Sequence, residues 1–244
     1  MADIGWGALQ DSEGFGTLGD DVDDYKLLTT EELTNLVEPA TNSDSCPLDL
    51  ESNSKLKLQH ASHGMIYANQ KQLLWDLYEQ KGLVMMQMRF DGVLGFPGGL
   101  VDEGETPVEG MNREMHEEIG LDLTKYSFNE QHHIASYLNK AKNLVLHFYL
   151  MEVTVEDFST LELKTLNAKE YGIETYGIIR VPLFTMGDGL RGFPAFLANQ
   201  FAGHSRCELI LGLLTAKLFT ENEMAIALSS YRQYAESLRN KKLL

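Results

Sequence analysis

Three glutamates, Glu114, Glu117 and Glu118, stand at positions i, i+3 and i+4, the spacing that puts side chains on one face of a helix. Like charges this close destabilise an isolated helix, and a divalent cation offsets that cost. Hard cations such as Mg²⁺ and Mn²⁺ select carboxylate oxygens. We therefore expect a magnesium or manganese site here, with all three glutamates as ligands. The alternative is a solvated acidic helix face, which is what most charge runs are.

The residues at fixed distances around the glutamates favour the metal site. They are Gly99, Glu105, Arg113, Gly120 and Leu121. A loop, helix and loop that hold a metal need a turn, a clamp, a helix stop and a packing residue at these places, whereas a solvated face needs none of them. The Arg113 guanidinium is predicted to hold Glu105 or Glu114 in one orientation, because its planar fork matches a carboxylate.

The chemistry that such a site favours is hydrolysis of a pyrophosphate, with a metal that neutralises the phosphates and lowers the pKa of a bound water. One carboxylate would accept the proton of that water. Glu117 is the first candidate for this base, and Glu174 on a late strand is the second, with an exposed strand residue as the alternative for Glu174. The paired glycines after Pro97 allow close backbone approach, so the Gly98 carbonyl is a candidate metal ligand, although such a run alone is more often a turn.

The elements that must position these residues are predicted from short apolar runs and from capping residues. A helix is expected from Thr106 and Pro107 to Gly120, where glycine suits the left-handed residue after a helix end. Strands are expected at 61–68, 83–90, 132–138, 143–153 and 172–181, and later helices at 193–199, 206–219 and 221–239. The pattern predicts an α+β fold, an α/β/α sandwich in which a mixed sheet is flanked by helices and carries a loop-helix-loop metal site.

The charge of the chain is unevenly spread. The net charge is −16, and residues 1–54 hold thirteen acidic side chains against one basic one, Lys26, so this segment contributes −12. An acidic front end argues against broad, sequence-independent binding of nucleic acid. We expect residues 1–55 to be a disordered extension and 56–244 to be the catalytic domain. In the extension, Thr29 and Glu32 form a capping box that predicts a short helix ending near Pro39, either a partner-binding peptide or a transient helix.

The cysteine content and the apolar runs bear on the compartment. The chain has only two cysteines, Cys46 and Cys207, and no secretory signal or long apolar run is recognisable, so we expect a protein of a reducing intracellular compartment with no membrane association.

The stretch MQMRFDG at 86–92, followed by LGFPGG at 94–99, resembles the small-nucleolar-RNA-decapping Nudix hydrolases, the type-16 subfamily. In this resemblance the glutamate pattern from Gly99 to Leu121 is a complete Nudix box. Further shared stretches lie at 60–68, 147–149, 177–183 and 196–203, so that the resemblance covers nearly everything from about residue 58 to 214.

The resemblance implies a homodimeric Nudix fold that cleaves the diphosphate linkage of RNA caps and of inosine diphosphates, with Mg²⁺, Mn²⁺ or Co²⁺, in nucleus, nucleolus and cytoplasm. It places substrate contacts on His63, Arg89 and Phe96, and metal ligands on Gly98, Glu114 and Glu118. A histidine can hydrogen-bond a base edge, an arginine can bind a phosphate, and a phenylalanine ring can stack on a base. Taken singly, a histidine is more often a structural hydrogen-bonding residue and a phenylalanine more often core.

Two positions depart from the resemblance. Tyr137 stands where the subfamily has a histidine near the metal, so that this accessory contact is expected to be lost or filled by water. Glu208 stands where a glutamine reads the base edge. A carboxylate only accepts hydrogen bonds, so our hypothesis is a shift from hypoxanthine toward guanine, which offers two donors; the alternative is that Glu208 faces solvent on its helix.

Two other functions compete with a decapping hydrolase. Some relatives have lost box residues and act as non-catalytic binding modules for RNA or protein, whereas this chain keeps Glu114, Glu117 and Glu118. One fold hosts many substrates, so an ADP-ribose or dinucleotide pyrophosphatase is the second alternative. The acidic extension is also expected to be able to bind a protein partner.

Overall fold

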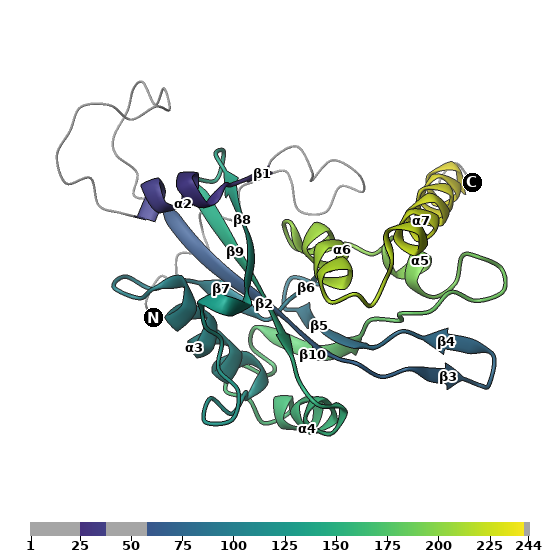
Figure 1. Cartoon of the computed structure of the whole chain (residues 1–244), viewed down its shortest axis with the longest axis horizontal. Helices are drawn as coiled ribbons and strands as arrows, with labels where there is room; N and C mark the ends of the chain where they lie inside the picture. The colour runs from purple at the N-terminus through teal and green to yellow at the C-terminus, as the bar shows by residue number, and fades with distance from the viewer. Residues whose placement is uncertain (1–24, 38–57, 242–244) are drawn as a thin grey trace.

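A mixed sheet forms the centre of the molecule (Figure 1). A computed structural model describes residues 25–37 and 58–241. The strands are β1 (Tyr25–Leu27), β2 (Gln59–Ala68), β5 (Leu83–Arg89), β6 (Leu94–Gly95), β7 (Gly98–Leu100), β8 (His133–Asn139), β9 (Leu144–Glu152) and β10 (Thr175–Arg180). Their main order is β1-β8-β9-β2-β5-β10, while β6 pairs with β5 and β7 with β2. The five strands that the sequence predicts are confirmed, and the sheet is mixed because β2 and β9 run parallel. A separate hairpin, β3 (Gln72–Leu74) and β4 (Tyr78–Gln80), was not expected.

Helices cover both faces of the sheet (Figure 1). Successive residues of β2 divide between two apolar clusters, with Met65 in one and Ile66 in the other, as the alternation of a strand requires. The first cluster contains residues of α5 (Phe193–Phe196), α6 (Ser205–Thr215) and α7 (Glu221–Lys241). The second contains residues of α3 (Pro107–Ile119) and α4 (Val155–Thr165). The predicted α+β sandwich is confirmed.

Local signals set the ends of α3. The Thr106 hydroxyl accepts a hydrogen bond from the Glu109 backbone, the Glu109 side chain accepts one from the Thr106 backbone, and Pro107 is the first helical residue. Gly120 ends the helix with φ 68°, in the left-handed region that favours glycine. The helix therefore has the bounds that the sequence predicts. In contrast, α6 ends earlier than predicted, and Lys217, two residues beyond it, has a φ of 57° that does not continue a helix.

Residues 25–37 differ from the solvated extension that the composition predicts. The short strand β1 pairs antiparallel with β8, from Tyr25 opposite Asn139 to Leu27 opposite Tyr137, and so covers an edge that would otherwise lack hydrogen-bond partners. The capping box of Thr29 and Glu32 opens α2 (Thr30–Val37), as predicted. The rest of the extension, including Cys46, lies outside the described residues, and the division of the chain at 55/56 stays a prediction.

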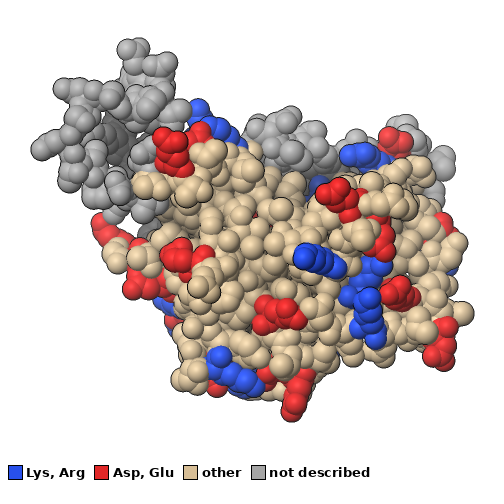
Figure 2. Space-filling model, in the orientation of Figure 1, with Lys and Arg blue, Asp and Glu red and all other residues tan. Residues whose placement is uncertain are grey.

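The surface and the helices bear on partners. On the face shown in Figure 2, acidic and basic side chains are interspersed, with no broad basic area. This arrangement agrees with the expectation that bulk attraction to a phosphate backbone is weak on that face. Among the described helices, none combines the length and the apolar character that crossing a membrane requires.

Candidate active site

Three carboxylates meet at one place beside the sheet. Glu114 and Glu118 come from α3, and Glu170 comes from the loop between α4 and β10; one oxygen of each lies within 4.8 Å of the others. The Glu170 backbone N–H donates to the Glu117 carbonyl at 3.1 Å, which ties this loop to the end of α3. The sequence reasoning missed Glu170, because a single glutamate in a loop carries no spacing signal.

The backbone of β7 approaches these carboxylates closely. The Gly98 N–H donates to Glu118 Oε2 at 2.6 Å. Gly98 has φ 137°, and a Cβ there would lie 2.0 Å from the Ser62 carbonyl oxygen, so only glycine fits. A Cβ on Gly99 would lie 2.7 Å from Glu114 Oε1. The paired glycines therefore allow the loop to close on the α3 carboxylates, as their place in the sequence predicts.

Further side chains hold the carboxylates in position. Arg113 donates to Glu105 at 3.0 Å, to Glu114 at 2.7 Å and to the Leu100 carbonyl at 2.9 Å. The predicted clamp is confirmed, and it holds both candidate glutamates at once. A second support was not predicted: Gln87 donates to Glu118 at 3.1 Å and accepts from the Thr175 hydroxyl at 2.9 Å. Gln87 is completely buried.

The electrostatics of the cluster favour protons or a cation. Burial raises the pKa of Glu114 to about 7 and that of Glu118 to about 8, and the charge of Glu114 adds to the effect on Glu118. Burial also raises the pKa of Glu170. Carboxylates buried this close together are costly to keep ionised, and three hard oxygen donors with this spacing suit Mg²⁺ or Mn²⁺. The residues present therefore fit a divalent cation.

The two candidates for the general base lie beside this cluster. Glu117 forms ion pairs with Lys169 and, at 3.6 Å, with Arg113, and it does not belong to the group of three. Glu174 lies immediately before β10 rather than on it, so its expected place on a strand is corrected. It is partly buried, and burial together with Glu170 raises its pKa. Both assignments stay predictions.

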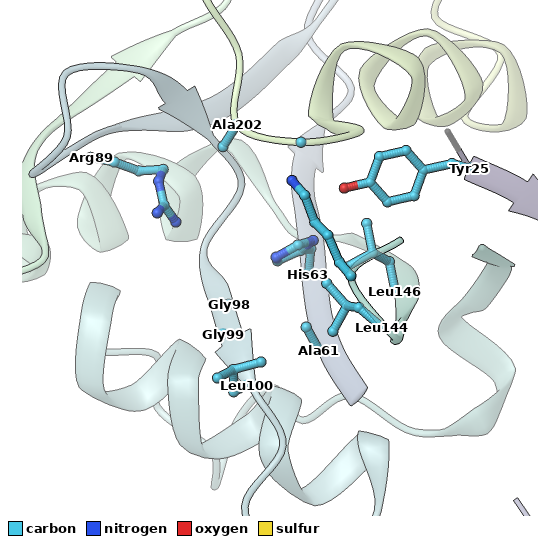
Figure 3. A pocket seen from close by; sticks show the side chains of 12 residues that line it. Tyr25, Ala61, His63, Arg89, Gly98, Gly99, Leu100, Leu144, Leu146 and Ala202 are labelled. Atoms are coloured by element: carbon cyan, nitrogen blue, oxygen red, sulfur yellow. The ribbon is translucent and has the colours of Figure 1, made fainter. Parts of the chain in front are cut away.

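A pocket is lined in part by Gly98 and Gly99 (Figure 3), the glycines of β7 that lie against the carboxylates. Its lining includes Tyr25, His63 and Arg89 together with Gly98 and Gly99, so the predicted substrate residues His63 and Arg89 do lie at one cavity. Arg89 also forms an ion pair with Asp91 at 3.1 Å. This ion pair restrains the position of the Arg89 side chain in the pocket lining.

The predicted base-contacting residues divide between the pocket and the core. Phe96 is buried in the core against Phe148 and is not part of the pocket lining; this position matches the alternative of a core residue, and its stacking role stays a prediction. Glu208 is 0 % exposed, so the alternative of a solvent-facing residue is wrong. Its carboxylate lies 3.6 Å from His63 Nδ1, and neither oxygen has a hydrogen-bond partner among the described residues.

Tyr137, the other departure from the resemblance, is buried against a histidine. Its ring centroid lies 4.3 Å from that of His204. It belongs to a small apolar cluster with Ala61 and Leu146, which also line the pocket. Tyr137 therefore packs against residues of the pocket floor.

A mixed sheet between helices, with clamped carboxylates on the helix that follows a paired-glycine strand, defines the class of Nudix hydrolases. The chain belongs to the Nudt16-like family, described as U8 snoRNA-decapping enzyme-like, whose profile matches residues 60–219. It is 42% identical over 194 residues to the U8 snoRNA-decapping enzyme of Homalodisca vitripennis, covering 80% of this chain and 94% of that protein. It is 37% identical to that of Xenopus laevis, over 73% of this chain and 86% of that one. It is also 35% identical to the human Tudor-interacting repair regulator protein, over 70% of this chain and 80% of that protein.

Proposed function

We propose that this Nudix hydrolase is a metal-dependent decapping enzyme that also cleaves free nucleoside diphosphates. The observation that carries the proposal is the cluster of Glu114, Glu118 and Glu170 beside a pocket that contains Arg89 and His63. In the reaction, water adds to one phosphorus and the bond from phosphorus to the bridging oxygen breaks. The products are a nucleoside monophosphate and phosphate from a nucleoside diphosphate, or a 5′-phosphorylated RNA and the released cap nucleotide from a capped RNA. A small nucleolar RNA substrate would imply action in the nucleus and nucleolus.

Each residue has a role in this proposal. Glu114, Glu118 and Glu170 would hold Mg²⁺, Mn²⁺ or Co²⁺, with the Gly98 carbonyl as a further candidate ligand. The cation would neutralise the phosphates and acidify the attacking water. Arg113 and Gln87 keep the carboxylates oriented, and Arg89 binds a phosphate.

Proton removal is assigned to a carboxylate next to the cluster. Glu117 is our first choice for the base, because it adjoins Glu114 and Glu118 on α3 without belonging to the group of three. Its ion pair with Lys169 would have to open for it to reach a water. Glu174, with its raised pKa, is the second choice.

A Glu118→Gln substitution tests the proposed activity. The neutral amide keeps the shape but lacks the charge that binds a cation, so we expect release of monophosphate from guanosine or inosine diphosphate and from capped RNA to fall at least about a hundredfold. The fold should persist, because the amide keeps an oxygen for the Gly98 N–H. Product chromatography in Mg²⁺ and in Mn²⁺ measures the effect, and ADP-ribose is included to test the dinucleotide alternative.

The matched control is Glu156→Gln, since Glu156 is an exposed glutamate on α4. It should keep wild-type turnover. Unfolding of Glu118→Gln would instead indicate a structural cluster. A wild-type protein that binds nucleotide or RNA without turnover would favour the binding-only alternative, to which the kinship with the Tudor-interacting repair regulator protein lends weight.

Base preference is the finer part of the proposal. The Glu208 carboxylate, whose oxygens have no hydrogen-bond partner among the described residues, can only accept hydrogen bonds, and guanine offers N1–H and an amino group where hypoxanthine offers N1–H alone. We expect guanosine diphosphate to be cleaved with a kcat/KM about tenfold or more above that of inosine diphosphate. Direct competition of the two substrates measures the ratio. Glu208→Gln should shift it toward inosine, and a clear inosine preference in the wild type would contradict the hypothesis.

A further inference from the structure

The N-terminal strand β1 brings a tyrosine to the nucleotide pocket. Tyr25 is part of the pocket lining together with His63 and Arg89, and Figure 3 shows its ring reaching from β1 toward the side on which His63 lies. The strand is held by pairing with β8, Tyr25 opposite Asn139. Tyr25 thus joins the pocket from a segment far in sequence from residues 60–219, which the family profile matches.

The ring of Tyr25 is fixed against the loop that opens α6. Its centroid lies 4.8 Å from that of His204, with 36° between the planes. A Cβ on Gly203, whose φ is 46°, would lie 3.1 Å from the Tyr25 hydroxyl, so the loop backbone passes close to the ring. The Glu208 N–H donates to the His204 carbonyl at 3.0 Å. Tyr25 therefore packs on the residues that lead into the helix that carries the buried Glu208.

The remaining lining of the pocket indicates which part of a ligand Tyr25 would meet. Ala61, Leu144 and Leu146 give an apolar floor, and Tyr25 packs against the same apolar cluster. Arg89 and the glycines of β7, which adjoin the carboxylates, lie in another part of the pocket. The lining also holds a second cation, Lys142, but the reacting diphosphate must reach the carboxylates, which adjoin the β7 glycines. The nucleoside, with its flat base, then extends toward the tyrosine and the apolar floor.

From this geometry we propose that Tyr25 is a binding residue for the nucleoside of the substrate, its ring forming the wall against which a purine and its ribose pack. Aromatic rings bind bases through their faces without reading their edges, so Tyr25 supplies affinity while Glu208 supplies selectivity. The N-terminal segment is then a part of the site, and an enzyme cut to the matched residues 60–219 would lack this wall. The inference deepens the proposed function and rests on it for the identity of the ligand.

Four full-length proteins test the inference: wild type, Tyr25→Ala, Tyr25→Phe and the matched control Leu27→Ala, in which an exposed residue of the same strand is changed. Calorimetry in EDTA, where the proposed hydrolysis does not run, measures the affinity for guanosine diphosphate and for inorganic pyrophosphate. Tyr25→Ala should weaken guanosine diphosphate about tenfold or more, whereas Tyr25→Phe and Leu27→Ala stay within about twofold. Pyrophosphate, which lacks a nucleoside, should bind all four proteins alike.

Two results would overturn the inference: equal affinity of Tyr25→Ala and wild type for guanosine diphosphate, or an equal loss for both ligands, which would show a general collapse of the site. If the alanine variant loses its cooperative melting transition, Tyr25→Leu replaces it, because leucine keeps apolar bulk without a flat ring.

Product analysis separates this inference from the proposed function. Tyr25-dependent binding without turnover in Mg²⁺ or Mn²⁺ would contradict only the hydrolase activity, whereas turnover with no role for Tyr25 would contradict only the inference.

Discussion

The β7 backbone lies so close to the α3 carboxylates that a side chain at Gly99 would displace one of them. Gly99→Ala tests it, because the new Cβ would lie 2.7 Å from Glu114 Oε1 while the backbone at Gly99 is not left-handed. The carboxylate must then move, and we expect the affinity for Mn²⁺ to fall by about tenfold or more, as for other changes around metal ligands. Titration calorimetry with Mn²⁺ measures the loss.

Gly187→Ala is the control for that substitution, since no atom lies within 4 Å of its Cβ position and its φ is ordinary. It should bind Mn²⁺ like the wild type. An unchanged Mn²⁺ affinity in Gly99→Ala would mean that Glu114 is not a ligand. Gly98 is unsuitable for this experiment, because its positive φ and its contact with the Ser62 carbonyl would disturb the sheet as well as the site.

Helix geometry explains which glutamates the sequence could place together. At about 100° per residue, Glu118 lies about 40° from Glu114 around the α3 axis, whereas Glu117 lies about 60° to the other side. Spacing alone predicts one acidic face with three members. The structure divides that face: Glu114 and Glu118 meet Glu170, and Glu117 turns toward Lys169. The third member of the cluster comes from a loop, whose position depends on how α4 packs, and no local pattern reports that.

The same distinction between local and tertiary signals holds for the other elements. The capping box, the first-turn proline and the glycine stop of α3 are local, and so its bounds could be predicted. The three residues of β1 sit in an acidic segment, and their strand exists because β8 has a free edge to pair with. The burial of Glu208 and of Phe96 depends on how α6 and the sheet meet, which residue types alone do not determine.

At the scale of the whole molecule, the chain is acidic, with a net charge of −16 that includes the glutamates of the site. Figure 2 shows basic side chains mixed with acidic ones on one face rather than gathered into a groove. Binding of RNA would therefore depend on the cap in its pocket more than on bulk attraction to the backbone. A weak salt dependence is the expected accompaniment of such binding, because few phosphate contacts release few counterions.

The buried carboxylates also link folding stability to pH and to metal. With folded pKa values of about 7 and about 8, Glu114 and Glu118 keep protons that the unfolded chain releases near its ordinary 4.5. Their contribution to stability is full below that value and is lost as the pH rises through 7 and 8.

A cation that replaces the protons should thus raise the Tm of the wild type several degrees more at pH 8.5 than at pH 6.5. Burial lowers the pKa of His147 to about 3, and this group removes stability only as the pH falls below its ordinary 6.5, outside the interval compared. Melting curves with and without Mg²⁺ measure this change in Tm, and Glu156→Gln should behave like the wild type. If Mg²⁺ raised the Tm equally at both pH values, or still raised it in Glu118→Gln, the cation would bind elsewhere.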